Sequence, residues 1–516
     1  MKKNQNFLVG ALILGVAGAF SKVLGAIYRI PLARLIGGEG MGLYQMAYPI
    51  YTTILSLATA GVPVAISVLV ARKETQGLRG DSRRIFKVSL LTLLVLGALL
   101  SLLVYQGAEF FAYRVLHEPR ALYPIMAIAP AIFFSGLMAV FRGYFQGYQW
   151  MVPTAVSQVI EQIFRVTFVL ILAFWLFPRG LEYAAAGATF GAVIGGIAGI
   201  IVLIGFYLRF HRQQAQEQVP IAHSQDSSAS LGMDMIKLAI PVSFGAVVVP
   251  LVQMLDAVIV PSRLMATGYS TAQATELYGQ LSGMASVLIN LPTIFTIAIS
   301  TSLVPAISEA IARQDRLDLQ GRLNHAVRAA MLVALPSAAG LYVLAHQITD
   351  LLFASPEAGI PLEPLAFSVI VLAAFQISSA ALQGLGKPNI PLRNLIITGL
   401  FKVFFNFYLT GTFLGIRGPA IGTVVAFFVG SMLNFYALKQ LTDWRFERVR
   451  FIKLTVVTLV MGIAVSRGYQ ALVEYGIYSY ISTLLAITLG VVLYTGILFL
   501  IRELDIKMIR SLFKMK

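Results

Sequence analysis

Residues 183–208 read YAAAGATFGAVIGGIAGIIVLIGFYL and contain no charged side chain. As a helix rising about 1.5 Å per residue, this run is about 39 Å long. The hydrocarbon core of a bilayer is only about 30 Å thick, and its interior offers the backbone no hydrogen-bond partner except within a helix or a closed barrel. The run therefore predicts a membrane-spanning helix.

The composition extends this prediction to the whole chain. Of the 516 residues, 58% are hydrophobic and 12% are charged, and the mean hydropathy is +0.80. A soluble protein has about 25% charged residues, so the composition excludes an ordinary soluble enzyme and a disordered chain. We predict an all-α polytopic membrane protein with about fourteen transmembrane helices. Besides 183–208, the runs are 7–28, 42–70, 86–106, 122–142, 155–177, 235–262, 277–303, 324–346, 362–384, 394–416, 419–440, 452–473 and 480–501.

The basic residues predict the orientation of these helices. The 39 Lys and Arg residues exceed the 23 Asp and Glu residues, which gives a formal charge of +16. With a cytoplasmic N-terminus and strict alternation, 28 of the 39 fall on the cytoplasmic side and 8 on the other. This asymmetry supports fourteen helices with both termini cytoplasmic. Because the charges are scattered between apolar runs, no nucleic acid partner is expected.

A polar stretch at 209–232 predicts a flexible cytoplasmic linker between two lobes. The predicted domains are an N-terminal lobe over 1–208 with six helices and a C-terminal lobe over 233–441 with six more. Residues 442–516 add helices thirteen and fourteen and a basic tail.

Four short motifs recur in the same order, at offsets of 232 to 242 residues. The pairs are Leu43-Tyr44-Gln45 with Leu277-Tyr278-Gly279-Gln280, Val62-Pro63-Val64-Ala65-Ile66-Ser67 with Val304-Pro305-Ala306-Ile307-Ser308, Phe145-Gln146-Gly147 with Leu382-Gln383-Gly384, and Ala186-Gly187-Ala188 with Gly418-Pro419-Ala420. A repeat of six helices, an even number, places both copies in the same direction across the membrane. The sequence thus predicts two parallel pseudo-repeats around a central cavity, a plan suited to alternating access.

Motifs for catalysis are missing from the sequence. There is no cysteine, no phosphate-binding G-x-x-x-x-G-K-[ST] motif and no D-x-D, and the five histidines lack metal-ligand spacing. We therefore expect a protein that is not an enzyme, with no catalytic residue, metal or cofactor. Coupling to the membrane potential or to a monovalent cation stays open.

Charged residues within the runs identify candidate binding residues, because each costs at least ~2.5–3.5 kcal/mol at the bilayer centre. Lys22 and Arg29 lie seven residues apart, as do Asp256 and Arg263, so each pair shares a helix face. We predict that they form a cationic site for an anionic headgroup. The alternative for Arg29 and Arg263 is snorkelling toward the interface.

The remaining charged and proline residues receive weaker roles. Glu161 and Arg165 have the i, i+4 spacing of a structural ion pair. Lys402 faces either the cavity or a lateral groove, and Arg34 is a further cavity candidate. The paired Pro63 and Pro305 are candidate hinges or gates, although membrane helices tolerate proline in general.

Two segments resemble a known superfamily. Ser21-Lys22-Val23-Leu24-Gly25, followed by Ala33-Arg34-Leu35-Ile36-Gly37, resembles the first-helix signature of the lipid II flippase family. The segment from Leu277 through Ser302-Leu303-Val304-Pro305-Ala306-Ile307-Ser308-Glu309 resembles the stage V sporulation protein B branch of the same multidrug/oligosaccharidyl-lipid/polysaccharide (MOP) exporter superfamily. The likeness in layout covers nearly the whole chain.

The resemblance implies a fourteen-helix transporter that moves undecaprenyl-diphosphate-linked sugars outward across the bacterial plasma membrane. It also implies cavity cations on the diphosphate, and helices thirteen and fourteen beside the lipid tail. It places Lys22 at the first essential Arg of the family and Tyr28 at the second, with Arg29 one position on. The Arg of the family's second helix has no counterpart between Thr52 and Gly61.

The leading expectation is a flippase for lipid II in peptidoglycan synthesis, during growth or sporulation. Its partners would be a lipid-linked oligosaccharide, membrane lipids and cell-wall synthesis proteins. The alternatives are a flippase for a teichuronic, capsule or O-antigen type of repeat unit, a multidrug cation antiporter, and a non-transporting membrane scaffold.

Overall fold

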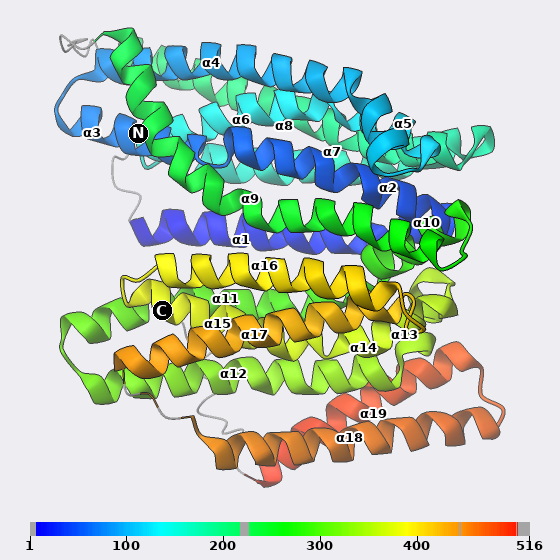
Figure 1. The fold of residues 1–516 in the computed structure, drawn as a ribbon. Coiled ribbons are helices and arrows are strands. Elements are labelled where there is room, and N and C mark those ends of the chain that lie inside the picture. Colours follow the sequence, from blue (N-terminus) through cyan, green and yellow to red (C-terminus); the bar gives the residue numbers. More distant parts are fainter. Residues whose placement is uncertain (1–6, 217–226, 443, 445, 502, 504–516) are drawn as a thin grey trace. The chain divides into compact units, whose positions relative to one another are not determined.

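The computed structural model describes residues 7–216, 227–442, 444, 446–501 and 503, and every regular element among them is helical (Figure 1). The predicted basic tail and the centre of the predicted linker lie outside the described residues. The elements are α1 (Phe7–Ile27), α2 (Arg29–Thr59), α3 (Val62–Thr75), α4 (Arg79–Gln106), η1 (Phe110–Val115), η2 (Pro119–Ala121), α5 (Leu122–Ile128), α6 (Pro130–Gly147), α7 (Val152–Leu176), η3 (Phe177–Arg179), α8 (Leu181–Gln216), α9 (Ser228–Ala266), α10 (Thr271–Tyr278), η4 (Gly279–Ala285), α11 (Ser286–Ala312), α12 (Arg316–Val343), α13 (Ala345–Phe353), η5 (Pro356–Ala358), α14 (Gly359–Ala366), α15 (Ser368–Gly384), α16 (Asn389–Thr410), α17 (Arg417–Thr442), α18 (Arg448–Glu474) and α19 (Ser479–Leu500).

Twelve helical stretches of the described chain are long and apolar enough to cross a membrane, and a bent pair raises this number to thirteen. The chain is thus an all-helical polytopic membrane protein. The number of candidate spans differs from the predicted fourteen for two reasons. The stretch Leu12–Thr75 contains two of the predicted runs, and Pro356–Ala366 is bent by 44° against Ser368–Gly384 where one run was expected. The predicted number therefore stays a prediction.

The chain divides into two compact units, Met1–Gly279 and Gln280–Lys516. Helix α9, which follows the predicted linker, belongs to the first unit and packs against α2, α3 and α4. Its Ser243 Oγ accepts a 3.0 Å hydrogen bond from the backbone N–H of Gly61. Helices α8 and α9 also extend into 209–232, because α8 ends at Gln216 and α9 begins at Ser228.

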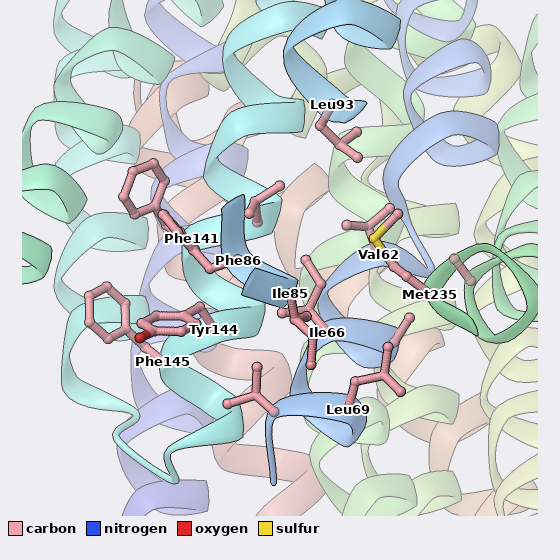
Figure 2. Close-up of a cluster of buried hydrophobic side chains, with 14 of the residues drawn as sticks. Val62, Ile66, Leu69, Ile85, Phe86, Leu93, Phe141, Tyr144, Phe145 and Met235 are labelled. Carbon is pink, nitrogen blue, oxygen red and sulfur yellow. The ribbon is translucent and has the colours of Figure 1, made fainter. Parts of the chain in front are cut away.

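A buried aromatic and aliphatic cluster holds the first unit together (Figure 2). Phe86 of α4 contacts two rings of α6, with ring centroids 5.1 Å from Phe141 and 4.8 Å from Tyr144. Helix α3 contributes Ile66, and α9 contributes Met235 to the same cluster. Burial of side chains of this size stabilises a soluble fold by about 1.5–3 kcal/mol each; inside lipid, close packing supplies the equivalent attraction.

The second unit contains α11 to α19. Helix α15 packs against α11, α12 and α17, and the hairpin of α18 and α19 packs on α12. Buried amides connect neighbouring helices, since Asn394 of α16 donates to Asn434 of α17 at 2.8 Å. Arg328 of α12 pairs with Glu503 beyond α19 at 2.8 Å.

One repeated motif makes the same helix contact in each unit. A Cβ on Gly147 at the end of α6 would lie 2.6 Å from Val70 Cβ and 3.1 Å from the Ser67 carbonyl oxygen of α3. In the second unit, a Cβ on Gly384 of α15 would lie 2.8 Å from both Ile307 Cβ and the Val304 carbonyl oxygen of α11. In both units, the glycine of this repeated motif thus packs on the helix that carries the repeated Val-Pro segment.

A second motif behaves in the same way. A Cβ on Gly187 of α8 would lie 2.8 Å from the Leu172 carbonyl oxygen of α7. A Cβ on Gly418 of α17 would lie 2.7 Å from the Leu409 carbonyl oxygen of α16. Small residues at such positions let helix backbones approach closely within a membrane. In both units, a glycine of this motif thus packs on the preceding helix.

Candidate functional site: an arginine and tyrosine cluster in the first unit

Three tyrosines of α2 occupy one helix face. Tyr44, Tyr48 and Tyr51 are spaced by four and three residues, which places them on adjacent turns. Ring centroids lie 5.8 Å apart between Tyr44 and Tyr48 and 5.7 Å apart between Tyr48 and Tyr51. The Tyr44 hydroxyl lies 2.8 Å from that of Tyr28, and the Tyr51 hydroxyl lies 3.0 Å from Ser135 Oγ of α6. The face is therefore lined with ordered hydroxyl groups.

Arg29 begins α2 and lies at one end of this face. Its charge acts on the side chains of Tyr28, Tyr44 and Tyr48. The side chain is half-buried. Its Nε is buried and has no hydrogen-bond partner among the described residues. Buried polar groups normally find a partner, so this donor needs an explanation.

The predicted pair of Glu161 and Arg165 on α7 forms a salt bridge and has a third member. Arg165 Nη2 donates to Glu161 Oε1 at 2.6 Å, and Arg142 Nη2 of α6 donates to Glu161 Oε2 at 2.8 Å. Arg142 also donates from Nε to Ser157 Oγ at 3.2 Å. One carboxylate thus serves two guanidinium groups.

Arg165 connects this triad to the tyrosine face. Its charge acts on Tyr48, Tyr51 and Tyr28 as well as on Glu161. Helix α8 approaches closely behind the triad, because a Cβ on Gly195 would lie 2.7 Å from the Glu161 carbonyl oxygen. The cluster holds Arg29, Arg142 and Arg165 against one carboxylate, and this excess of positive charge suits an anion with several oxygens.

The other predicted site residues of the first unit differ in exposure. Lys22 is exposed on α1, Arg34 is exposed on α2, and Asp256 and Arg263 are half-buried on α9. Pro63 is the second residue of α3 and is half-buried.

Two predicted residues belong to the second unit and are outside the cluster described above. Lys402 is half-buried on α16, and Pro305 is exposed within α11. No group of three or more His, Cys, Asp or Glu that could hold a metal occurs in the described part of the chain.

Sequence reasoning missed Arg142 and the tyrosine face. The spacing of Tyr44, Tyr48 and Tyr51 was available as a sequence signal, although such a stripe commonly packs in a core. Arg142 gave no sequence signal, because it sits near the end of a predicted span and its contact with Glu161 joins two different helices.

A second polar network connects α10 with the segment before α5 and with α2, within the first unit. Arg120 donates from Nε and Nη2 to the two oxygens of Glu118 at 2.9 and 2.8 Å, and from Nη1 to Glu39 at 2.6 Å. Thr275 of α10 donates to Glu118 Oε2 at 2.7 Å. Burial alone would raise the pKa of Glu118, but the hydrogen bonds from Arg120 and Thr275 outweigh it and lower the pKa below its ordinary value.

The model of a family described as "Polysaccharide biosynthesis protein" matches residues 7–311 of the chain. The chain belongs to this family. A second family model, MatE, matches residues 281–408 of the same chain.

Two relatives come from Bacillus subtilis (strain 168). Stage V sporulation protein B is 33% identical over 432 residues, which cover 83% of each chain. The lipid II flippase MurJ is 26% identical over 487 residues, covering 90% of this chain and 88% of the relative.

Solved structures share the fold at low sequence identity. A lipid II flippase MurJ in an inward closed conformation has a TM-score of 0.73 at 16% identity and covers 95% of this chain and 99% of its own. An inward-facing multidrug resistance MATE transporter of the MOP superfamily has a TM-score of 0.67 at 16% identity, covering 82% and 94%. The chain is a multi-pass membrane protein of the MOP superfamily, a group of transporters and flippases, and it is not an enzyme.

Proposed function

We propose that the chain moves an undecaprenyl-diphosphate-linked oligosaccharide from the inner to the outer leaflet of the bacterial plasma membrane. The observation that carries the proposal is the cluster of Arg29, Arg142 and Arg165 inside membrane-spanning helices, with a single carboxylate among them. Such an excess of cations is costly in lipid and suits a phosphorylated headgroup. The printed name of one relative, the lipid II flippase, and the family description, polysaccharide biosynthesis protein, agree with this cargo.

Lipid II for peptidoglycan synthesis is the first candidate cargo, and another lipid-linked polysaccharide unit is the second. The second candidate is supported by the description of the matching family, polysaccharide biosynthesis protein. A multidrug cation antiporter is disfavoured, because a lipophilic cation requires carboxylates in excess of arginines.

In this proposal Lys22, Arg29 and Arg263 bind the diphosphate, and Asp256 pairs with them or responds to a coupling ion. Arg34 and Lys402 line further parts of the path, and Pro63 and Pro305 allow helices to bend. The membrane potential supplies about 2.3 kcal/mol per charge per 100 mV, so a dedicated ion site is not required.

The proposed architecture is two lobes of six helices plus two C-terminal helices, with both termini cytoplasmic and the lobes joined at 209–232. The stretch Leu12–Thr75 supports fourteen spans, because its 64 residues would extend about 96 Å as one helix, about three bilayer cores. Helices α1 and α2 run in opposite directions across the first unit (Figure 1). Gly147 in the first unit and Gly384 in the second each pack closely on a neighbouring helix of their own unit, and so do Gly187 and Gly418. These similar contacts support the proposed repeat.

Genetic rescue tests the proposal. A bacterium depleted of its own lipid II flippase receives the wild-type chain or Lys22→Ala, with membrane expression checked by immunoblot. We expect the wild type to restore growth and the well-expressed variant to fail, because a cation at the site is lost.

Each other outcome has a defined meaning. No rescue by a well-expressed wild type would contradict lipid II as the cargo and favour another lipid-linked glycan. Rescue by both chains would leave the function standing and remove Lys22 from the site.

A further inference from the structure

A cavity of about 420 Å³ lies in the second unit, where the end of α12, the short helix α14 and the start of α17 come together. Sites for small molecules have volumes of about 300–1,000 Å³ and combine an apolar lining with a few polar groups. The lining of this cavity is mostly apolar, and the ion pair of Glu363 with Arg417 supplies its charged groups. The cavity therefore has the size and the composition of a ligand site.

Glu363 is held in the cavity wall by two other segments of the chain. Its Oε2 accepts a hydrogen bond from Arg417 Nη2 of α17 at 3.1 Å, and its Oε1 lies 3.2 Å from His346 Nε2 of α13. His346 is itself fixed, because its Nδ1 donates to the carbonyl oxygen of Pro356 at 2.8 Å and a carbonyl oxygen only accepts. The carboxylate thus has a defined position before a ligand arrives.

The ion pair disfavours charged ligands. Glu363 repels a free anion, and Arg417 repels a cation. A neutral molecule with several hydroxyl groups suits the pair, because each hydroxyl both donates and accepts hydrogen bonds. Each carboxylate oxygen has two acceptor positions and a guanidinium group has five donors, so both side chains keep hydrogen-bonding capacity beyond the 3.1 Å bond between them.

Two aromatic rings line the same cavity. The ring centroids of Tyr342 on α12 and Phe367 lie 5.2 Å apart, and the two residues are 48% and 44% exposed. An interfacial aromatic belt would account for the rings alone, but not for a carboxylate that is anchored beside them from α13 and α17. A sugar ring has C–H groups on its faces and hydroxyls at its edge, so exposed aromatic rings beside an ion pair match it in both respects.

We propose that this cavity binds a sugar ring of the lipid-linked oligosaccharide on the outer side of the membrane. The inference rests on the proposed function and deepens it, because it adds a saccharide site in the second unit to the cationic headgroup site in the first. In the proposed topology α12 runs outward, so its end at Val343 and the start of α17 at Arg417 lie on the outer side. Contacts with the sugar let the chain distinguish a loaded carrier from bare undecaprenyl diphosphate.

The test compares two probes on the purified full chain in nanodiscs. Radiolabelled lipid II carries sugars, and radiolabelled undecaprenyl diphosphate carries none. We expect Tyr342→Leu to weaken lipid II binding about fivefold through loss of a ring contact, and Arg417→Gln about tenfold through loss of a charge-assisted hydrogen bond. Both variants should bind undecaprenyl diphosphate like the wild type. Equal losses for the two probes would overturn the inference.

Arg179→Gln is the matched control for Arg417→Gln. Arg179 is also an exposed arginine at the end of a helical segment on the predicted outer side, and its guanidinium lies 5.6 Å from the centroid of the Trp175 ring. This variant should bind both probes like the wild type. A loss of lipid II binding as large as in Arg417→Gln would contradict a specific site in the second unit.

A soluble disaccharide separates the sugar from its lipid. N,N′-diacetylchitobiose should lower the affinity of the wild type for lipid II toward that for undecaprenyl diphosphate, with less effect in Tyr342→Leu. An equal effect of the disaccharide on the two probes would contradict a saccharide site. Tyr342→Leu also decides the matter if Arg417→Gln does not fold, because Tyr342 is 48% exposed.

The outcomes separate this inference from the proposed function. If the wild type binds lipid II and both variants bind it equally well, the inference fails and the proposed function stands. A wild type that binds neither probe contradicts both.

Discussion

At the scale of single residues, the account depends on which polar groups are satisfied and which are not. Glu161 is fully used by two arginines, whereas Arg29 and Arg165 retain donors that the described protein does not occupy. In lipid an unused buried donor is expensive, so these two donors are consistent with the proposed headgroup site.

Glu118 gives a residue-scale prediction about pH. Its lowered pKa means that its ion pair with Arg120 contributes stability above the ordinary carboxylate pKa of about 4.3 and loses it as the pH falls through the lower value in the folded protein. We expect Glu118→Gln to melt below the wild type at pH 7, with the difference shrinking below about pH 4. Intrinsic fluorescence of the detergent-solubilised chain at pH 7, 5 and 3.5 measures this.

Glu309→Gln is the matched control for that measurement. Glu309 pairs with Arg313 and Arg322, but 48% of its side chain is exposed. Exposed ion pairs contribute little, so this variant should melt close to the wild type. A Glu118→Gln difference that stays constant from pH 7 to 3.5 would contradict the role assigned to its ionisation.

At the scale of helices, close backbone approach at repeated glycines organises both units. A Cβ added to Gly187 would lie 2.8 Å from a carbonyl oxygen of the preceding helix, and a Cβ added to Gly418 would lie 2.7 Å from one. We expect Gly187→Ala and Gly418→Ala each to destabilise the chain by about 1–3 kcal/mol through overpacking. Melting temperatures in detergent, measured for both variants, test whether the two positions are equivalent.

Gly205→Ala is the control at the same scale, because nothing lies within 4 Å of an added Cβ there. Alanine in a helix is favoured over glycine by about 0.5–1 kcal/mol, so this variant should melt at or slightly above the wild type. A neutral Gly187→Ala with a destabilising Gly418→Ala would contradict equivalent packing in the two units.

At the scale of the whole molecule, the sequence predicts what depends on one helix at a time. The membrane-spanning runs could be predicted because lipid requires apolar runs of a minimum length. The pair of Glu161 and Arg165 could be predicted because residues four apart are neighbours on one helix. Contacts between different helices could not be predicted from residue order, so the contact of Arg142 with Glu161 and the packing of α9 on α3 came only from the structure. The seven-residue spacing of Lys22 and Arg29 did not reveal that one is exposed and the other half-buried.

The central claim, that the chain carries a lipid-linked oligosaccharide through an arginine site, is tested most directly in proteoliposomes. Purified chain is reconstituted with a fluorescent undecaprenyl-diphosphate oligosaccharide, and its movement between leaflets is followed by quenching with membrane-impermeant dithionite under an imposed potential. The account predicts translocation by the wild type, strong reduction in Arg165→Gln and wild-type rates in Arg179→Gln. Transport of a lipophilic cation dye, with no movement of the lipid-linked oligosaccharide, would contradict it.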